Sequence, residues 1–239
     1  MKERPILMSA PMIRAILSGT KTQTRRVVKQ DLQRLGYGDW YAFDHNGINY
    51  RVNARHTTVA AWAHLLQFCP YGHPGDRMWV REAWRTAASL DERSPSSIAE
   101  MCIGAGYRKP WAPLLFEADG HRNSEWRGFE TPPKVSEPGK LRPGIHMPRW
   151  ASRITLEIVS VRVERLQDIS EEDAAAEGVY RESEDEIPFN GPWYINAGDS
   201  QGYATAKSCY EALWDSINGD GAWAANPWVW VIEFRRILP

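Results

Sequence analysis

The feature that most constrains the fold is the alternation of apolar and polar residues in "WASRITLEIVSVRVERL", residues 150–166. A period of two predicts a long strand that places one face on a core. The apolar phase runs through Ile154, Leu156 and Ile158 and then shifts to Val159 and its successors. Such a shift is typical of a β-bulge or sharp bend. The chain must therefore build a sheet around one bent strand.

Shorter patterns surround this strand. Further strands are predicted at 4–9, 22–27, 77–84, 114–119 and 226–238, and helices at 10–18, 170–177 and 205–218. Gly19 follows the first helix as a C-cap, and Ser170 precedes the second as an N-cap. In the last helix, Cys209, Leu213 and Ile217 form an apolar stripe. We expect an α+β fold with a small, curved or barrel-like mixed sheet and peripheral helices.

Three long segments lack this patterning and are rich in glycine, proline or polar residues: 31–73, 85–148 and 181–204. The 239 residues fit one large domain or one small core that carries long insertions. We predict a single domain, 1–239, in which these segments are insertions. Because long insertions usually carry function, we expect the first two to surround the mouth of a binding cleft.

The composition excludes several classes of protein. Hydrophobic residues make up 43% and charged residues 25% of the chain, which is unlike a disordered sequence. The net charge of −1 does not favour binding to bulk polyanions. Cys69, Cys102 and Cys209 form no CxxC pair, and we expect reduced thiols in a cytoplasmic protein. With no long apolar run and no signal peptide at the start, we expect no membrane partner.

The stretch "SGTKTQTRRVV", residues 18–28, is polar where a core strand would be apolar. On a strand, Thr22, Thr24 and Arg26 share one face, and Gln23, Arg25 and Val27 share the other. This pattern indicates either one wall of a site or a solvated edge.

Four pieces of the sequence, in this order, resemble the ASCH domain family of the PUA-like superfamily, especially its phage and prophage members. They are "SGTKTQTRR" after the first helix, "PGDRMWV", "ITLEIVSVRVERLQDISEEDAAAEGV" and "WVWVIEF". The resemblance implies a PUA-like β-barrel with a cleft lined by the first strand after the helix. It also implies nucleoside or single-stranded RNA partners, because many relatives bind RNA.

One branch of that family, the small bacterial N4-acetylcytidine amidohydrolases, carries a similar K-T-x-T run. The resemblance implies that Lys21, Thr24 and Glu177 are catalytic and that Arg26 lies beside them. A hydroxyl nucleophile needs a neutral base, and burial beside cations would lower the pKa of Lys21 accordingly. Glu177 would protonate the leaving amine or orient water. Because Lys21 and Thr24 face opposite ways on a regular strand, the mechanism also needs a bend at 20–22.

Each of these residues also has a purely structural interpretation. Lys21 suits the C-terminal end of a helix dipole, and Thr24 suits strand packing. Glu177 is placed at the unfavourable end of its helix for a carboxylate, which mildly favours a functional role.

We expect Thr22, Arg25 and Arg26, together with Arg149, Trp150 and Arg153, to bind substrate or nucleic acid. Arginine beside tryptophan suits contact with phosphate and stacking on a base, although a tryptophan that plugs the barrel is an alternative. Cys69 and His73 have the spacing of metal ligands, but a zinc site needs about four. We therefore expect no metal and no cofactor.

Two functions fit these observations. The first is an amidohydrolase that acts on an acylated nucleobase through Lys21, Thr24 and Glu177. The alternative is a non-catalytic protein that binds RNA or a modified nucleotide in the same cleft. Cleavage of RNA by a lysine-based site, known in the superfamily, is a less favoured third. The oligomeric state is not predicted by the sequence.

Overall fold

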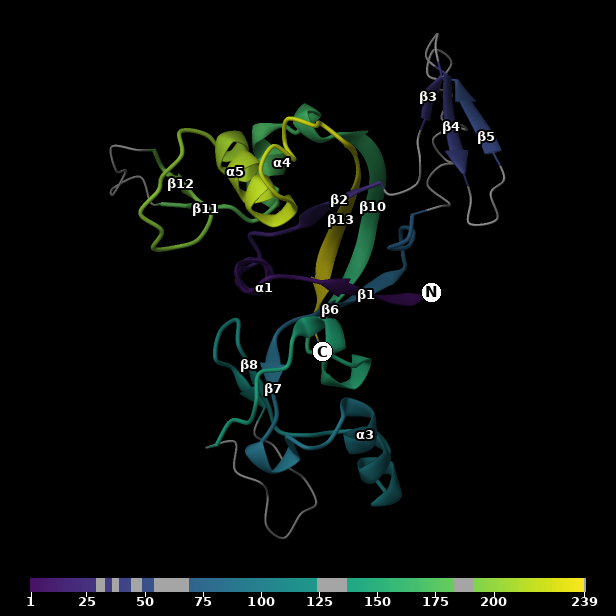
Figure 1. Ribbon diagram of the computed structural model, residues 1–239, viewed down its shortest axis with the longest axis vertical. Coiled ribbons are helices and arrows are strands. Elements are labelled where there is room, and N and C mark those ends of the chain that lie inside the picture. Colours follow the sequence, from purple (N-terminus) through teal and green to yellow (C-terminus); the bar gives the residue numbers. More distant parts are fainter. Residues whose placement is uncertain are drawn as a thin grey trace. The chain divides into compact units, whose positions relative to one another are not determined.

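The computed structural model describes residues 1–28, 33–35, 39–43, 49–53, 69–123, 137–182 and 191–238, and for 33–53 it describes the backbone alone. The chain divides into two compact units (Figure 1). The first unit contains residues 1–2, 19–76 and 157–235. The second unit contains residues 3–18, 77–156 and 236–239. Each unit is therefore assembled from segments that are distant in sequence.

The sheet of the first unit has β13 (Trp228–Ile237) between β10 (Thr155–Arg165) and β2 (Gln23–Val27). β13 and β2 are antiparallel, with Ile232 opposite Thr24 and Val231 opposite Arg25. Leu156 and Ile158 are buried at one end of β10 and Val161 and Val163 at the other, whereas Val159 is exposed. A change of phase therefore occurs between Ile158 and Val161, as expected, but the prediction that Val159 belongs to the second apolar phase is wrong.

Two helices of the first unit lie side by side in Figure 1, α4 (Glu171–Ala176) and α5 (Ala206–Asn218). Each helix has its own N-cap, because Ser170 accepts from Asp173 N–H and Thr205 accepts from Ser208 N–H. Both helices contribute to one hydrophobic cluster with β13. The caps fix where the helices begin, and the cluster fixes the face that each buries.

Smaller strands complete the first unit. β3 (Gln33–Leu35), β4 (Asp39–Phe43) and β5 (Asn49–Asn53) form an antiparallel sheet. β11 (Tyr180–Arg181) and β12 (Trp193–Tyr194) form an antiparallel pair. All of these short strands lie in or beside segments that the sequence predicts to be irregular insertions.

In the second unit, β1 (Glu3–Leu7) pairs in parallel with β6 (Arg77–Arg81), and α1 (Ala10–Ser18) follows β1 directly. An antiparallel sheet comprises β7 (Trp84–Arg85), β8 (Leu114–Phe116) and β9 (Arg122–Asn123). α3 (Pro95–Gly104) begins at the N-cap Ser94. Trp84, Leu114, Phe116 and Met147 are buried in the core of this unit.

The mixed α and β composition that the sequence predicts is confirmed. Among the described residues, no sheet closes into a barrel, and the PUA-like barrel stays a prediction.

The sequence does not predict α3. In the apolar stripe predicted for the last helix, Cys209 and Leu213 are buried but Ile217 is exposed. All three cysteines are free and buried. No helix in the described part of the chain is both long and apolar enough to cross a membrane.

The prediction of one domain with three insertions remains a prediction. Residues 54–68 of the first insertion and 183–190 of the third lie outside the described residues. The segment 85–148 belongs to the second unit and β2 to the first. The expectation that these segments surround the cleft at β2 likewise remains a prediction.

Candidate functional site

The site is built around Lys21, which stands just before β2. The backbone on its C-terminal side is held at two points, because Thr22 N–H donates to the carbonyl of Ala176 at 2.9 Å and the Thr22 carbonyl accepts from Phe234 N–H at 2.8 Å. Lys21 Nζ donates to the backbone carbonyl of Glu177 at 2.7 Å and to Glu177 Oε2 at 2.8 Å. The Lys21 and Glu177 side chains are only 0% and 2% exposed. The structure therefore brings these two residues into a buried ion pair.

Burial changes the protonation chemistry of this amine. Desolvation lowers the pKa of Lys21, the Glu177 carboxylate opposes that effect, and the cations Arg26 and Arg25 reinforce it. Because desolvation dominates, the neutral amine is more accessible than in an exposed lysine. A neutral amine is the form that can accept a proton from a hydroxyl group.

Arg25 joins the same carboxylate from β2. Its guanidinium donates to Glu177 Oε1 at 3.2 Å, to Glu164 Oε1 at 2.5 Å and to Asp173 Oδ2 at 2.9 Å. Burial opposes the charge of Arg25, but the field of Glu177 and the hydrogen bond to Glu164 raise its pKa overall. Both carboxylate oxygens of Glu177 are thus held by cations, one by Lys21 and one by Arg25.

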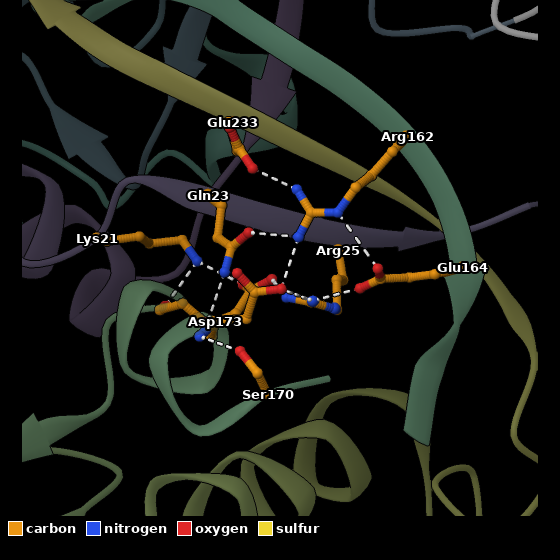
Figure 2. A network of polar contacts seen from close by, with 9 residues as sticks. Lys21, Gln23, Arg25, Arg162, Glu164, Ser170, Asp173 and Glu233 are labelled. Atoms are coloured by element: carbon orange, nitrogen blue, oxygen red, sulfur yellow. Dashed lines mark hydrogen bonds and ion pairs between the residues drawn. The ribbon is translucent and has the colours of Figure 1, made fainter. Parts of the chain in front are cut away.

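Arg162 of β10 extends the network away from Glu177. It donates to Asp173 Oδ2 at 2.6 Å, to Glu164 Oε2 at 3.2 Å and to Glu233 of β13. The network therefore combines three cations with four carboxylates (Figure 2). Since the charges nearly balance and the hydrogen bonds are shared, the arrangement holds Glu177 and Asp173 in fixed positions.

The strand pattern explains which side chains enter the network. Lys21, Gln23 and Arg25 alternate along the chain, and all three contact the segment 173–177. Gln23 Nε2 donates to the backbone carbonyl of Asp173 at 2.6 Å. Successive side chains of a strand point to opposite faces. Thr24 therefore lies on the other face of β2.

Thr24 is buried, and its side-chain hydroxyl has no hydrogen bond within the described part of the chain. Only 1% of its surface is exposed, and its Oγ1 has no partner there. The hydroxyl accordingly makes no hydrogen bond to Lys21 or Glu177 in this state. A buried hydroxyl without a partner is costly and is common where a ligand or a reaction uses it.

The remaining predicted residues of β2 have different environments. Thr22 is exposed and takes part through its backbone. Arg26 is half-buried, and its charge lowers the pKa of Lys21. Alternation places it on the same face of β2 as Thr24.

Three predicted binding residues lie in the second unit. Arg149 Nε donates to Glu3 at 2.8 Å, and Arg153 binds Glu82 and Asp119 at 2.9 Å. The ring of Trp150 is edge-on to that of Trp84, with centroids 6.1 Å apart. Both arginines are therefore engaged in ion pairs within their own unit. A cleft shared with β2 stays a prediction.

Sequence reasoning did not include five members of the network: Gln23, Arg162, Glu164, Asp173 and Glu233. It also missed Tyr210 of α5, which is 3% exposed. Burial and the nearby charge of Glu177 raise the pKa of Tyr210 well above its usual range. One signal was available, because Arg162 and Glu164 are charged residues two apart on the strongest predicted strand.

Metal binding is not suggested by this geometry. The carboxylates of the network are held by arginine and lysine. Within the described ranges, no group of three or more His, Cys, Asp and Glu side chains is arranged to hold a metal ion.

Comparisons with protein-family models, with curated proteins and with solved structures gave no match to this chain. The resemblance to ASCH domains consequently rests on the sequence pieces quoted above. The geometry of the site stands independently of it.

Proposed function

We propose that this protein is an amidohydrolase that removes an acyl group from a modified nucleobase, as in N4-acetylcytidine. The observation that carries the proposal is the buried pair of Lys21 and Glu177, in which desolvation lowers the pKa of the amine. A buried hydroxyl without a partner, that of Thr24, lies three residues from Lys21. The class of substrate comes from the resemblance of "KTQT" and "AAAEGV" to the acetylcytidine enzymes.

The reaction has two steps. Thr24 Oγ1 attacks the acyl carbon, and its proton passes to the neutral amine of Lys21. The C–N bond then breaks, the exocyclic amine leaves with a proton relayed through Glu177, and the acyl group remains on Thr24 as an ester. Water hydrolyses that ester to release the carboxylic acid and restore the hydroxyl.

This mechanism makes a structural demand. Lys21 Nζ now bonds to Glu177 and not to Thr24. The amine must therefore turn toward Thr24 to take its proton and return to Glu177 to pass that proton on to the leaving amine, while Glu177 keeps its contact with Arg25. Catalytic hydrogen bonds are often incomplete before substrate binds.

The test is incubation of the full chain with a panel of acylated cytidines, followed by chromatography. We expect release of cytidine from at least one member of the panel, with Thr24→Val inactive on the same compound. Thr24→Ser is the matched control, because it keeps a hydroxyl at the same position and should retain partial activity. No release from any compound in the panel would contradict the proposal.

A second candidate is a non-catalytic protein that binds RNA or a modified nucleotide. Its support comes from the hydrogen bonding of the site. Both carboxylate oxygens of Glu177 accept hydrogen bonds from cations, and the Thr24 hydroxyl makes no hydrogen bond to Lys21. In that case single-stranded RNA should bind weakly, and its affinity should fall steeply with salt. Binding that is insensitive to salt, or absent at low salt, would exclude RNA as the ligand of this candidate.

A further inference from the structure

The second unit contains a cavity of about 800 Å³ that belongs to no part of the site described above. Its walls include three aromatic residues, two cations and an amide: Tyr107, Trp111, Trp150, Arg108, Lys109 and Asn123. A cavity of 300 to roughly 1,000 Å³ is the size range of small-molecule sites. All of these residues lie within the second unit.

The aromatic walls are anchored to the core of the unit. Tyr107 N–H donates to the Cys102 carbonyl at 3.0 Å, which closes the end of α3. The Cys102 thiol donates to the Trp111 carbonyl at 3.0 Å, so the turn from 107 to 111 is tied to that helix at both ends. These hydrogen bonds therefore hold the turn that carries four of the lining residues, Arg108, Lys109, Pro110 and Trp111.

Trp150 is a further lining residue that is anchored to the core. It packs edge-on against the buried Trp84, at an interplanar angle of 86°. Tyr107 and Trp150 both pack against the hydrophobic cluster of this unit while remaining partly accessible. The rings are therefore packed on the core and partly exposed, and both line the cavity.

The charges at the cavity are available as well. Arg108 and Lys109 are exposed, and neither forms an ion pair within the described part of the chain. This distinguishes them from Arg149 and Arg153, whose guanidinium groups are paired with carboxylates. Two adjacent cations beside aromatic rings favour a ligand that has both a planar ring and a negative charge.

We propose that this cavity binds a nucleotide, with its base against the aromatic residues and its phosphate at Arg108 and Lys109. Base–aromatic stacking combined with basic side chains is the usual chemistry of single-strand recognition. An apolar ligand would not use the two cations, and an acidic peptide would not use three rings. This cavity does not include Lys21, and the proposal that it binds a nucleotide does not depend on the proposed hydrolase activity.

The experiment measures binding to the full chain by isothermal titration calorimetry, using cytidine, cytidine 5′-monophosphate and a short single-stranded RNA. We expect the monophosphate to bind and cytidine to bind more weakly, because only the former reaches the cations. RNA that binds more tightly than the monophosphate would identify a nucleic-acid strand as the natural ligand. Equal affinity per site for RNA and for the monophosphate would identify the free nucleotide as the natural ligand.

Variants locate the binding. Arg108→Glu with Lys109→Glu should weaken binding of the monophosphate at least about tenfold, because each change replaces a charge-assisted hydrogen bond to phosphate with repulsion. Arg93→Glu with Lys140→Glu makes the same change of charge at exposed positions of the same unit that do not line the cavity, and it should bind like the wild type. Trp111→Ala should weaken the nucleoside and the nucleotide alike, because it removes stacking and no charge.

Three results would overturn the proposal: no saturable binding of the monophosphate or of RNA, an equal loss in both charge-reversed variants, or unchanged binding in the variant of Arg108 and Lys109. Thr24→Val separates this proposal from the hydrolase. It should lose hydrolysis and retain binding of the monophosphate, because Thr24 belongs to the first unit and not to the cavity.

Discussion

At the scale of single residues, Thr24 carries the sharpest expectation about stability. Its buried hydroxyl has no partner in the part of the chain that the structure describes, so Thr24→Val removes an unsatisfied polar group and preserves the shape. We expect the free energy of unfolding to stay equal or to rise by about 1 kcal/mol. Urea denaturation measures it. A clear loss of stability would show that the hydroxyl is hydrogen-bonded in the native protein.

Lys21 behaves differently, because it is half of a buried ion pair. Lys21→Met leaves Glu177 with Arg25 as its remaining cation, and removal of one partner of a buried pair costs roughly 3–5 kcal/mol. We expect a loss near the lower end of that range. Combining Lys21→Met with Glu177→Gln in a double-mutant cycle should show a double variant less destabilised than the sum of the single ones. Additive losses would mean that the pair makes no net interaction.

The lowered pKa of Lys21 also predicts a dependence of stability on pH. Between the lowered native pKa and the ordinary value near 10.5, the unfolded lysine binds a proton that the native one does not. The free energy of unfolding therefore rises with pH in this window. Lys21→Met removes this contribution, so the difference in stability between wild type and variant should grow from neutral pH towards pH 10. A difference that shrinks instead would contradict the direction of the shift.

At the scale of elements, the six-residue helix α4 positions two carboxylates of the network. It carries Asp173, and the residue that follows it is Glu177, so the cap of this short helix supports the whole network. Ser170→Ala removes the hydrogen bond to Asp173 N–H and should cost about 1 kcal/mol. Glu211→Ala, at an exposed position of α5, is the control and should be nearly neutral. Thermal unfolding of both variants measures the difference, and equal effects would argue against the cap.

Elements with their own local signals could be predicted from the sequence. The helix at 10–18 and the caps Gly19 and Ser170 agree with the structure, and Gly19 has the left-handed φ of 85° that a C-cap requires. Strands of two or three residues, such as β7 to β9, are too short to show a period. α3 was missed because it lies among glycines and prolines and has few buried residues.

The site was partly predictable for a similar reason. Lys21 and Glu177 were named by resemblance, and the structure pairs them. Glu164 could not be assigned to Arg25, because β13 lies between the strands that carry these residues. A sequence pattern predicts which side chains share one face of a strand. It does not predict which side chains of other strands lie beside them in the sheet.

At the scale of the whole molecule, charge is organised locally. The net charge is only −1, yet the first unit gathers three cations and four carboxylates in one network around the buried Lys21, Arg25 and Glu177, whereas the second leaves Arg108 and Lys109 unpaired by the described residues. Balanced buried charges fix geometry, and exposed cations attract anions. We therefore assign the proposed chemistry to the first unit and the proposed nucleotide binding to the second.

The central claim is that Lys21 and Thr24 act as one catalytic unit, and the most direct measurement is hydrolysis of N4-acetylcytidine by the wild type, by Thr24→Val, by Lys21→Met and by the double variant. Release of cytidine is followed by chromatography at a temperature where all four proteins are folded. Each single variant should lose most of the activity, and the double variant should be little worse than either, because parts of one unit are not additive. A fully active Thr24→Val protein would contradict the account, since the hydroxyl could then be no nucleophile.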